Sequence, residues 1–228
     1  MTAKAWNLPA LIDHTVLRPE ATRADVRSLC REAVEFGFTV IFVPPCYAAE
    51  AVEAVAGTPV RVGIPVGFPL GGHTTTAKVA EAIDGVRQGA SILDMVINIS
   101  RLKSGDLDAV RQDIAEVVKA TPAAEHKVIL ETCYLTSQEK QTACRLVVEA
   151  GADYVKTSTG FGAGGATVED VKLMKAAVAD RAKVKASGGI RDWKSALAML
   201  EAGADRIGTS ASLKIMEEWS AARNGVEP

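Results

Sequence analysis

The sequence predicts an α/β protein, a single (β/α)8 TIM barrel that takes up residues 1–228 as one domain. Two observations predict this fold. Short apolar runs rich in valine and isoleucine alternate with longer amphipathic stretches along the whole chain, as in parallel strands covered by helices. The length is close to the roughly 250 residues of a single barrel, and 48% of the residues are hydrophobic, enough for a large core. An open doubly wound sheet, which usually has fewer strands, is the alternative.

Eight apolar runs are predicted to form the strands. They are Leu11–His14, Thr39–Val43, Arg61–Val66, Ile92–Ile97, Lys127–Glu131, Tyr154–Thr157, Lys183–Ala186 and Arg206–Gly208. Apolar residues at helical spacing fill the segments between them; residues 22–36, for example, end at Gly37, and residues 137–150 end at Gly151. No linker interrupts the alternation. Eight strands, each followed by a helix, are therefore expected to close into a parallel barrel.

A repeated segment aligns three of these strands. Residues 149–158 closely match residues 201–210, and residues 89–94 form a weaker third copy. Each copy contains a glycine that ends a helix, and the residues five positions beyond that glycine are Asp94, Lys156 and Gly208. The residue before each is apolar, and side chains alternate between the two faces of a strand. Asp94 and Lys156 are therefore expected to point into the barrel at similar heights, near the end where barrel enzymes carry out their chemistry.

Four predicted strands carry an ionisable side chain where a core residue is expected: Asp13, Asp94, Lys156 and Lys185. A structural ion-pair network is one interpretation, because isolated buried charges are costly. Two lysines on adjacent strands, about 5 Å apart, favour another. Each ammonium lowers the pKa of the other, which suits a nucleophilic amine. We expect Lys156 to attack a carbonyl, Lys185 to keep a positive charge beside it, and Asp94 and Asp13 to transfer protons.

Glycine-rich turns follow the last three predicted strands, at residues 158–165, 187–189 and 208–210, and each precedes a helix. Backbone N–H groups at helix N-termini, approached closely over glycines, bind anions. Barrels often hold a phosphate at the loops after their last two strands. The turns therefore predict a substrate that carries a phosphate.

Several function classes are excluded by composition. A net charge of −2 and a pI near 6 give no reason to expect nucleic acid. No run approaches the roughly 18 apolar residues of a membrane span, and the N-terminus lacks a signal-peptide pattern, so we expect a cytoplasmic protein. The cysteines form no CxxC pair and no zinc spacing, and are expected to be buried reduced thiols: Cys30, Cys46, Cys133 and Cys144.

The remaining polar candidates have weaker support. The three histidines, His14, His73 and His126, lie far apart, so no metal site is predicted. His14 is expected to be a packed or capping side chain, whereas His73 follows the third strand and is a candidate for lining the mouth of the barrel. Glu131 ends the fifth strand and either faces the site or anchors Lys156.

Five motifs together resemble one enzyme family. They are Ile-Asp-His-Thr at residues 12–15, Asp-Met-Val-Ile-Asn at 94–98, Val-Ile-Leu-Glu-Thr at 128–132, Val-Lys-Thr-Ser-Thr-Gly-Phe at 155–161 and Lys-Ala-Ser-Gly-Gly-Ile-Arg at 185–191. The resemblance is to the deoxyribose-phosphate aldolases and extends from about Leu11 to Ser212. It implies reversible cleavage of 2-deoxy-D-ribose 5-phosphate, a small phosphorylated sugar, to D-glyceraldehyde 3-phosphate and the short aldehyde acetaldehyde. It also implies no metal, no organic cofactor, a cytoplasmic location and a homodimer.

The resemblance assigns roles to individual residues. It places the Schiff-base lysine at Lys156, the proton-managing lysine at Lys185, the catalytic aspartate at Asp94 and a polar-network aspartate at Asp13. The phosphate site falls on Gly160, Gly188, Gly189, Gly208 and Ser210.

The chain also departs from the family pattern. Phe161 stands where some members have a phosphate-binding lysine, and Ala211 where some have a second serine, so the phosphate is expected to rely on backbone donors. The second strand ends in Phe42-Val43-Pro44-Pro45, where many relatives have cysteine and asparagine.

Three other functions remain open at this point. A transaldolase-like barrel would also form a Schiff base with a related phosphosugar. A sugar-phosphate isomerase would use an acid/base pair and no covalent step. A non-catalytic phosphosugar-binding barrel would not need the two strand lysines.

Overall fold

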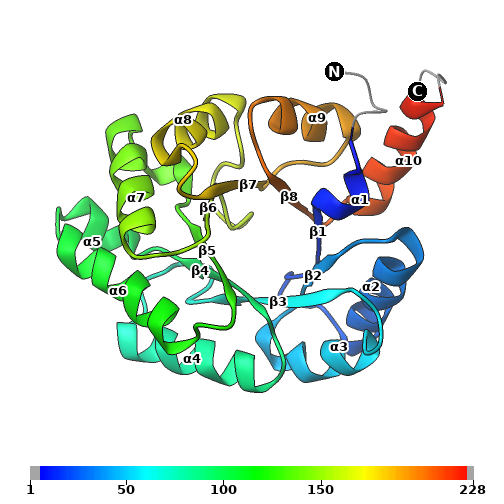
Figure 1. Ribbon diagram of the computed structural model, residues 1–228, viewed down its shortest axis with the longest axis horizontal. Helices are drawn as coiled ribbons and strands as arrows, with labels where there is room; N and C mark the ends of the chain where they lie inside the picture. The colour runs from blue at the N-terminus through cyan, green and yellow to red at the C-terminus, as the bar shows by residue number, and fades with distance from the viewer. Residues whose placement is uncertain (1–5, 225–228) are drawn as a thin grey trace.

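The computed structural model describes residues 6–224, and the ends of the expected domain, residues 1–5 and 225–228, lie outside the described residues. The described chain forms a closed barrel of parallel strands in the order β1 to β8, with helices packed around it (Figure 1). The predicted (β/α)8 fold is confirmed. None of the described helices is long and apolar enough to cross a membrane.

The strands lie close to their predicted positions. They are β1 (Ile12–Thr15), β2 (Val40–Phe42), β3 (Arg61–Val66), β4 (Ile92–Val96), β5 (Glu125–Ile129), β6 (Tyr154–Lys156), β7 (Lys183–Ser187) and β8 (Arg206–Thr209). The largest difference is in β5, which begins two residues earlier than predicted and ends at Ile129. It stops there because Glu131 adopts a left-handed backbone, φ 54°, which an extended strand cannot contain.

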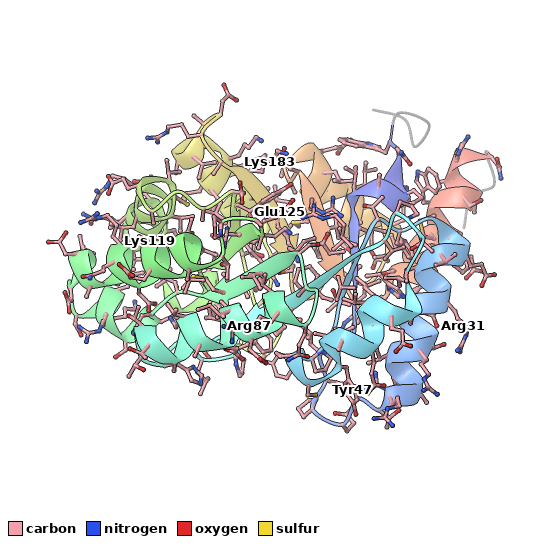
Figure 2. The ribbon with its side chains drawn as sticks, turned by 60° about the horizontal axis from the view of Figure 1, so that its bottom comes forward. Arg31, Tyr47, Arg87, Lys119, Glu125 and Lys183 are labelled. Carbon is pink, nitrogen blue, oxygen red and sulfur yellow. The ribbon has the colours of Figure 1, made fainter. Side chains whose placement is uncertain are left out.

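The helices cover the outside of the barrel. They are α1 (Leu8–Leu11), α2 (Arg23–Phe36), the 3-10 turn η2 (Pro45–Tyr47), α3 (Ala48–Ala54), α4 (Thr75–Arg87), α5 (Ile99–Lys103), α6 (Leu107–Ala120), the 3-10 turn η3 (Thr132–Tyr134), α7 (Ser137–Glu149), α8 (Val168–Val178), α9 (Trp193–Glu201) and α10 (Ser212–Arg223). Capping boxes at Thr22 and Thr136 start α2 and α7, and Gly37 ends α2 in the left-handed conformation. Charged side chains such as Arg31 and Arg87 project from these helices into solvent (Figure 2).

The strand register determines which side chains share a level inside the barrel. A layer takes residues from alternate strands and advances by about one residue per strand. Asp94 pairs with Lys127 on β5, and Lys127 pairs with Tyr154 on β6. An advance of two residues over these two strands leads from Tyr154 to Lys156, which is therefore the residue of β6 in the same layer as Asp94. The same step leads from Lys156 to Gly208 on β8, and from Gly208 to Phe42 on β2. Phe42, Asp94, Lys156 and Gly208 thus form one layer, hereafter the upper layer. The predicted common height of Asp94, Lys156 and Gly208 is confirmed.

The odd-numbered strands supply the layer below. Counting in the same way gives Asp13, Gly63, Lys127 and Lys185, hereafter the lower layer. Each layer contains one glycine that leaves room for a large neighbour in the other. A Cβ on Gly63 would lie 2.5 Å from the ring of Phe42, and a Cβ on Gly208 would lie 2.8 Å from Cε of Lys185. Charged and aromatic side chains therefore fill these two layers, and they pack against the backbone of Gly63 and Gly208.

The loop between β3 and α4 contains a glycine that is required by its backbone conformation as well as by lack of space. Gly71 has φ +70°, and a Cβ there would lie 2.1 Å from the backbone oxygen of Ile97. We predict that Gly71→Ala lowers the free energy of unfolding by more than about 1 kcal/mol. The alanine would have to adopt a positive φ, and its Cβ would overlap a backbone atom that cannot easily move away. Gly72→Ala is the control, since its Cβ would meet nothing within 4 Å. Urea denaturation measures both; equal effects would contradict the prediction.

Candidate active site

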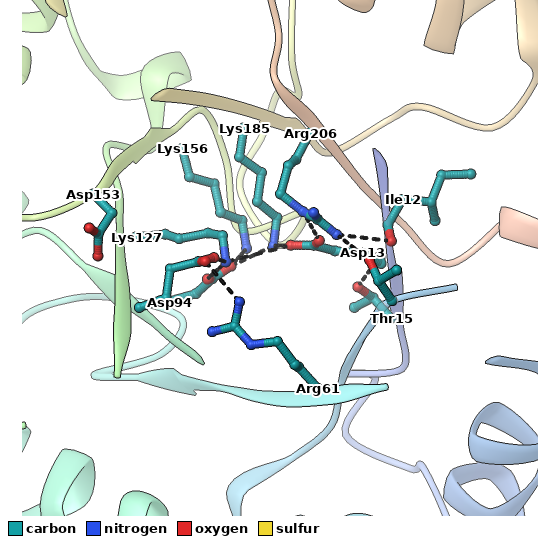
Figure 3. A network of polar contacts seen from close by, with 12 residues as sticks. Ile12, Asp13, Thr15, Arg61, Asp94, Lys127, Asp153, Lys156, Lys185 and Arg206 are labelled. Carbon is teal, nitrogen blue, oxygen red and sulfur yellow. Dashed lines mark hydrogen bonds and ion pairs between the residues drawn. The ribbon is translucent and has the colours of Figure 1, made fainter. Parts of the chain in front are cut away.

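The strand residues predicted to carry the chemistry meet inside the barrel (Figure 3). Both lysines donate to Oδ2 of Asp94, Lys156 Nζ at 2.7 Å and Lys185 Nζ at 2.7 Å. Lys185 Nζ also lies 2.6 Å from Oδ2 of Asp13. All four side chains are buried. The structure thus brings Asp13, Asp94, Lys156 and Lys185 into one continuous network.

Two more cations belong to this network, and neither was predicted from the sequence. Lys127 Nζ lies 2.5 Å from Glu125 Oε1, 3.9 Å from Asp94 Oδ1 and 4.0 Å from Asp13 Oδ2. Arg206 Nε donates to Asp13 Oδ1 at 2.5 Å. The prediction of four charged strand residues was therefore incomplete. Lys127 and Arg206 each stand first in their predicted strands, so neither gave the signal of the other four, an ionisable residue flanked by apolar strand neighbours.

The two central lysines differ in pKa because they have different numbers of carboxylate neighbours. Burial and the charge of Lys185 together lower the pKa of Lys156 to about 8, against the opposing effect of Asp94. Burial also disfavours the Lys185 cation, but Asp13 and Asp94 outweigh it and raise the pKa of Lys185 above its ordinary value. The prediction that each lysine would have a lowered pKa is correct for Lys156 and wrong for Lys185. Lys156 is the amine that can lose its proton near neutral pH.

The two aspartates stay ionised. Burial alone would raise the pKa of each carboxyl, but the surrounding cations lower it below its ordinary value. For Asp94 the main opposing charges are Lys156 and Lys185, and for Asp13 they are Lys185 and Lys127. Asp94 is therefore a hydrogen-bond acceptor that contacts both lysine amines at once.

A cavity of about 610 Å³ opens above this network at the C-terminal ends of the strands. Lys156 reaches into it, whereas Asp94 and Lys185 are not among its lining residues and lie beneath. All five predicted phosphate-site residues line it: Gly160, Gly188, Gly189, Gly208 and Ser210. Two cations that were not predicted from the sequence, Arg18 and Arg191, also line it. Arg18 is already paired with Asp25, at 2.6 Å.

Only one of the three predicted turns presents an uncapped helix N-terminus. The amides of α9 are taken by carboxylates, with Asp192 accepting from the Ser195 N–H at 2.7 Å and Glu218 accepting from the Trp193 N–H at 2.7 Å. Helix α8 begins well after the turn at Gly160 and is capped by Thr167. Helix α10 has no side-chain cap. Among these three helices, only α10 therefore leaves the amides of its first turn without a side-chain acceptor.

Glu131 anchors a loop. Its buried carboxylate accepts the Thr159 backbone N–H at 3.2 Å and also the Thr159 hydroxyl, and burial raises its pKa. It is not one of the residues that line the cavity. Neither predicted role, facing the site or anchoring Lys156, describes it; it fixes the turn after β6 that carries Gly160.

The histidines and cysteines lie outside the network. His14 is packed, as predicted, between Ser212 Oγ and Glu32 Oε2, both at 2.9 Å, and His73 is exposed without lining the cavity. All four cysteines are free, as predicted, but only Cys30 and Cys144 are buried, because Cys46 and Cys133 follow the strands in exposed turns. Within residues 6–224 no group of three or more metal-binding side chains is found.

A buried lysine with a lowered pKa, at the base of a barrel cavity, is the arrangement that an enzyme forming a Schiff base with a carbonyl substrate requires. Comparison with known proteins agrees. A family model described as DeoC/LacD family aldolase matches residues 8–218. A deoxyribose-phosphate aldolase of Thermoanaerobacter sp. is 55% identical over 217 residues, which cover 94% of this chain and 97% of that protein.

Two further relatives support the same family. The deoxyribose-phosphate aldolase of Brevibacillus brevis is 52% identical over 210 residues, covering 92% of this chain and 95% of that protein. A tetrameric deoxyribose phosphate aldolase from Aeropyrum pernix has a TM-score of 0.85 at 34% identity, over 92% of this chain and 90% of that one. The chain belongs to the DeoC/LacD family of aldolases. The predicted enzyme class, an aldolase that acts as a lyase, is confirmed.

The charge state of Lys156 predicts how activity depends on pH. Only the neutral amine adds to a carbonyl, so kcat/KM should rise with pH and level off above about 8, falling about tenfold per unit below it. Asp94 raises the pKa of Lys156, so Asp94→Asn should move the acid limb of the profile to lower pH. Initial rates between pH 5 and pH 10 provide the measurement, at roughly half-unit steps. A limb centred near 10.5, the ordinary value for lysine, would contradict this account.

Proposed function

We propose that this protein is a deoxyribose-phosphate aldolase that cleaves 2-deoxy-D-ribose 5-phosphate reversibly to D-glyceraldehyde 3-phosphate and acetaldehyde, with Lys156 as the nucleophile. The observation that carries the assignment of Lys156 is its position: a buried amine with a pKa of about 8 that reaches into the cavity and touches one carboxylate below. The names of the curated relatives support the choice of substrate.

Catalysis begins when the neutral amine of Lys156 adds to the C1 aldehyde of the open-chain sugar. The resulting carbinolamine takes up a proton, loses water and becomes an iminium. The C3 hydroxyl then gives up its proton and the C2–C3 bond breaks, its electron pair moving to the iminium to form an enamine, and glyceraldehyde 3-phosphate leaves. Protonation of the enamine at C2 and addition of water release acetaldehyde and the free amine.

Lys185 and Asp94 manage these protons in the proposed mechanism. Lys185 is held as an ammonium between Asp13 and Asp94 and contacts the same Asp94 oxygen as Lys156. It can therefore give a proton to the departing hydroxyl and take one back through Asp94 or a bound water. Lys127 and Arg206 keep the two carboxylates ionised and in position.

The phosphate is proposed to bind in the part of the cavity lined by the five residues predicted to hold it. Gly188 and Gly189 have positive φ and expose the backbone there, and Ser210 precedes the uncapped N-terminus of α10. Gly160 and Gly208 complete the lining, and Arg191 adds a cation at the same cavity. Phe161 also lines the cavity and brings no charge.

We further propose that residues 1–228 form one domain, that the protein works in the cytoplasm as a homodimer, and that it binds neither nucleic acid nor membranes. The absence of a strong net charge supports the last point. The Aeropyrum pernix relative is described as a tetramer, which supports self-association of some order.

Reductive trapping tests the nucleophile. Borohydride added with 2-deoxyribose 5-phosphate or acetaldehyde should leave a stable adduct on Lys156, identified by peptide mass spectrometry. Lys156→Met should abolish the adduct and lower kcat by at least about 10³-fold, because the covalent route is lost. Lys183→Met, which removes an exposed lysine at the opposite end of the barrel, is the control.

The outcome also separates the alternatives. A sugar-phosphate isomerase would leave Lys156 unmodified. A transaldolase-like enzyme would form the adduct but would fail to join acetaldehyde to glyceraldehyde 3-phosphate. A non-catalytic barrel would bind the sugar equally well before and after the Lys156→Met substitution.

The phosphate site can be tested by comparing two substrates. Arg191→Leu should lower kcat/KM for 2-deoxyribose 5-phosphate about tenfold and leave kcat/KM for unphosphorylated 2-deoxyribose nearly unchanged, since a charge-assisted hydrogen bond contributes about 1.5–3 kcal/mol. Arg181→Leu is the control, because Arg181 is exposed and donates to the backbone of Ala177 away from the cavity. Equal losses on both substrates would place Arg191 outside the phosphate site.

A further inference from the structure

Phe42 lies in the middle of the lysine network. It belongs to the upper layer, and its side chain is only 1% exposed. The Nζ atom of Lys185 is 3.8 Å from the centroid of its ring, while Lys127 Nζ is 5.5 Å and Lys156 Nζ is 5.6 Å away. A single aromatic ring thus lies within cation–π distance of three lysine amino groups, and much nearer to Lys185 than to the others.

The position of the ring is set by its neighbours. Gly63 pairs with Phe42 on the neighbouring strand β3. A Cβ at position 63 would lie 2.5 Å from Cζ of Phe42, so the ring fills the space that a side chain at position 63 would need. Val40 and Ile92 form a small apolar cluster with Phe42 inside the barrel, separate from the main core outside it. The ring is therefore clamped, and its face cannot turn away from Lys185 without displacing these residues.

Lys185 shares its two carboxylate partners with other cations, so a further group that stabilises its positive charge has an effect. The ionisable groups that face it or its carboxylate partners come from five strands: Asp13 on β1, Asp94 on β4, Glu125 and Lys127 on β5, Lys156 on β6 and Arg206 on β8. Asp13 and Asp94 are shared among four cations. An aromatic face stabilises a cation through its quadrupole and neither accepts nor gives a proton, so it adds favourable potential without adding a competing base.

We propose that Phe42 is a positioning residue for the aldolase reaction: its ring holds Lys185 as the ammonium below Lys156, so that Lys156 is the amine that reacts with the carbonyl. This inference rests on the proposed function, in which Lys156 is the nucleophile and Lys185 the proton donor. The ring favours a cation at Lys185 over one at Lys156, because cation–π attraction weakens with distance and the two distances are 3.8 and 5.6 Å. The selection between two neighbouring lysines is thus partly made by a hydrocarbon side chain.

Phe42→Leu removes the π face and keeps an apolar side chain of similar reach. Above its plateau, kcat/KM should fall again where the proton donor Lys185 loses its proton, and this fall is the alkaline limb. Stabilisation by the ring raises the pKa of Lys185, so loss of the ring should move the alkaline limb to lower pH by about one unit. After borohydride reduction, peptide mass spectrometry should detect no substrate adduct on Lys185, because a pKa lowered by about one unit still lies above that of Lys156. Lys156 should still form an adduct, because its amine is unchanged.

Phe38→Leu is the matched control. Phe38 is also a phenylalanine exposed by 1%, four residues earlier in the chain, but it belongs to the core between the strands and the helices. Its replacement should cost similar stability and leave both the alkaline limb and the adduct distribution unchanged. Should Phe42→Leu fail to fold, Gly63→Ala, which displaces the ring, gives the same readouts with the same expected direction.

The outcomes are separable. An alkaline limb that stays in place in Phe42→Leu overturns the role of Phe42 and leaves the proposed function intact. Absence of any adduct on the unsubstituted enzyme overturns the proposed function and the inference together. An alkaline limb that moves in Phe42→Leu and stays in place in Phe38→Leu, with the adduct on Lys156 in both variants, supports the inference.

Discussion

The shared hydrogen bonds at Oδ2 of Asp94 tie the interior of this barrel together. Lys156 and Lys185 both donate to that one oxygen, and Lys127 lies within ion-pair distance of the other oxygen of the same carboxylate. A buried charge without a partner costs several kcal/mol, so four cations around two aspartates are stable only in an arrangement that shares each carboxylate. The unequal sharing, two carboxylates at Lys185 and one at Lys156, is what makes the two lysines chemically different.

The steric arrangement of the two layers follows from the same constraint. Charged side chains are long, and a barrel interior closes around them only where the backbone yields space. Gly208 admits the stem of Lys185, and Gly63 admits the ring of Phe42. The network and its packing are therefore specified together, which is why the chain has glycine inside two strands where branched residues usually fill a barrel.

Much of this was predictable from local patterns. The fold followed from eight apolar runs, and the common height of Asp94 and Lys156 followed from a repeat that reflects the regular stagger of the strands. Lys127 was not predicted, because it follows the polar His126 and the fifth strand begins two residues earlier than the apolar pattern indicates. Features that depend on distant partners gave no such signal. Glu218, for example, reaches the N-terminus of α9 from another helix.

That capped helix has a consequence for how a substrate can lie in the cavity. Carboxylates at the start of α9 repel an anion, whereas the start of α10 carries no such group. The two helix N-termini therefore differ in local potential: carboxylates disfavour an anionic group at α9, and no side-chain cap does so at α10.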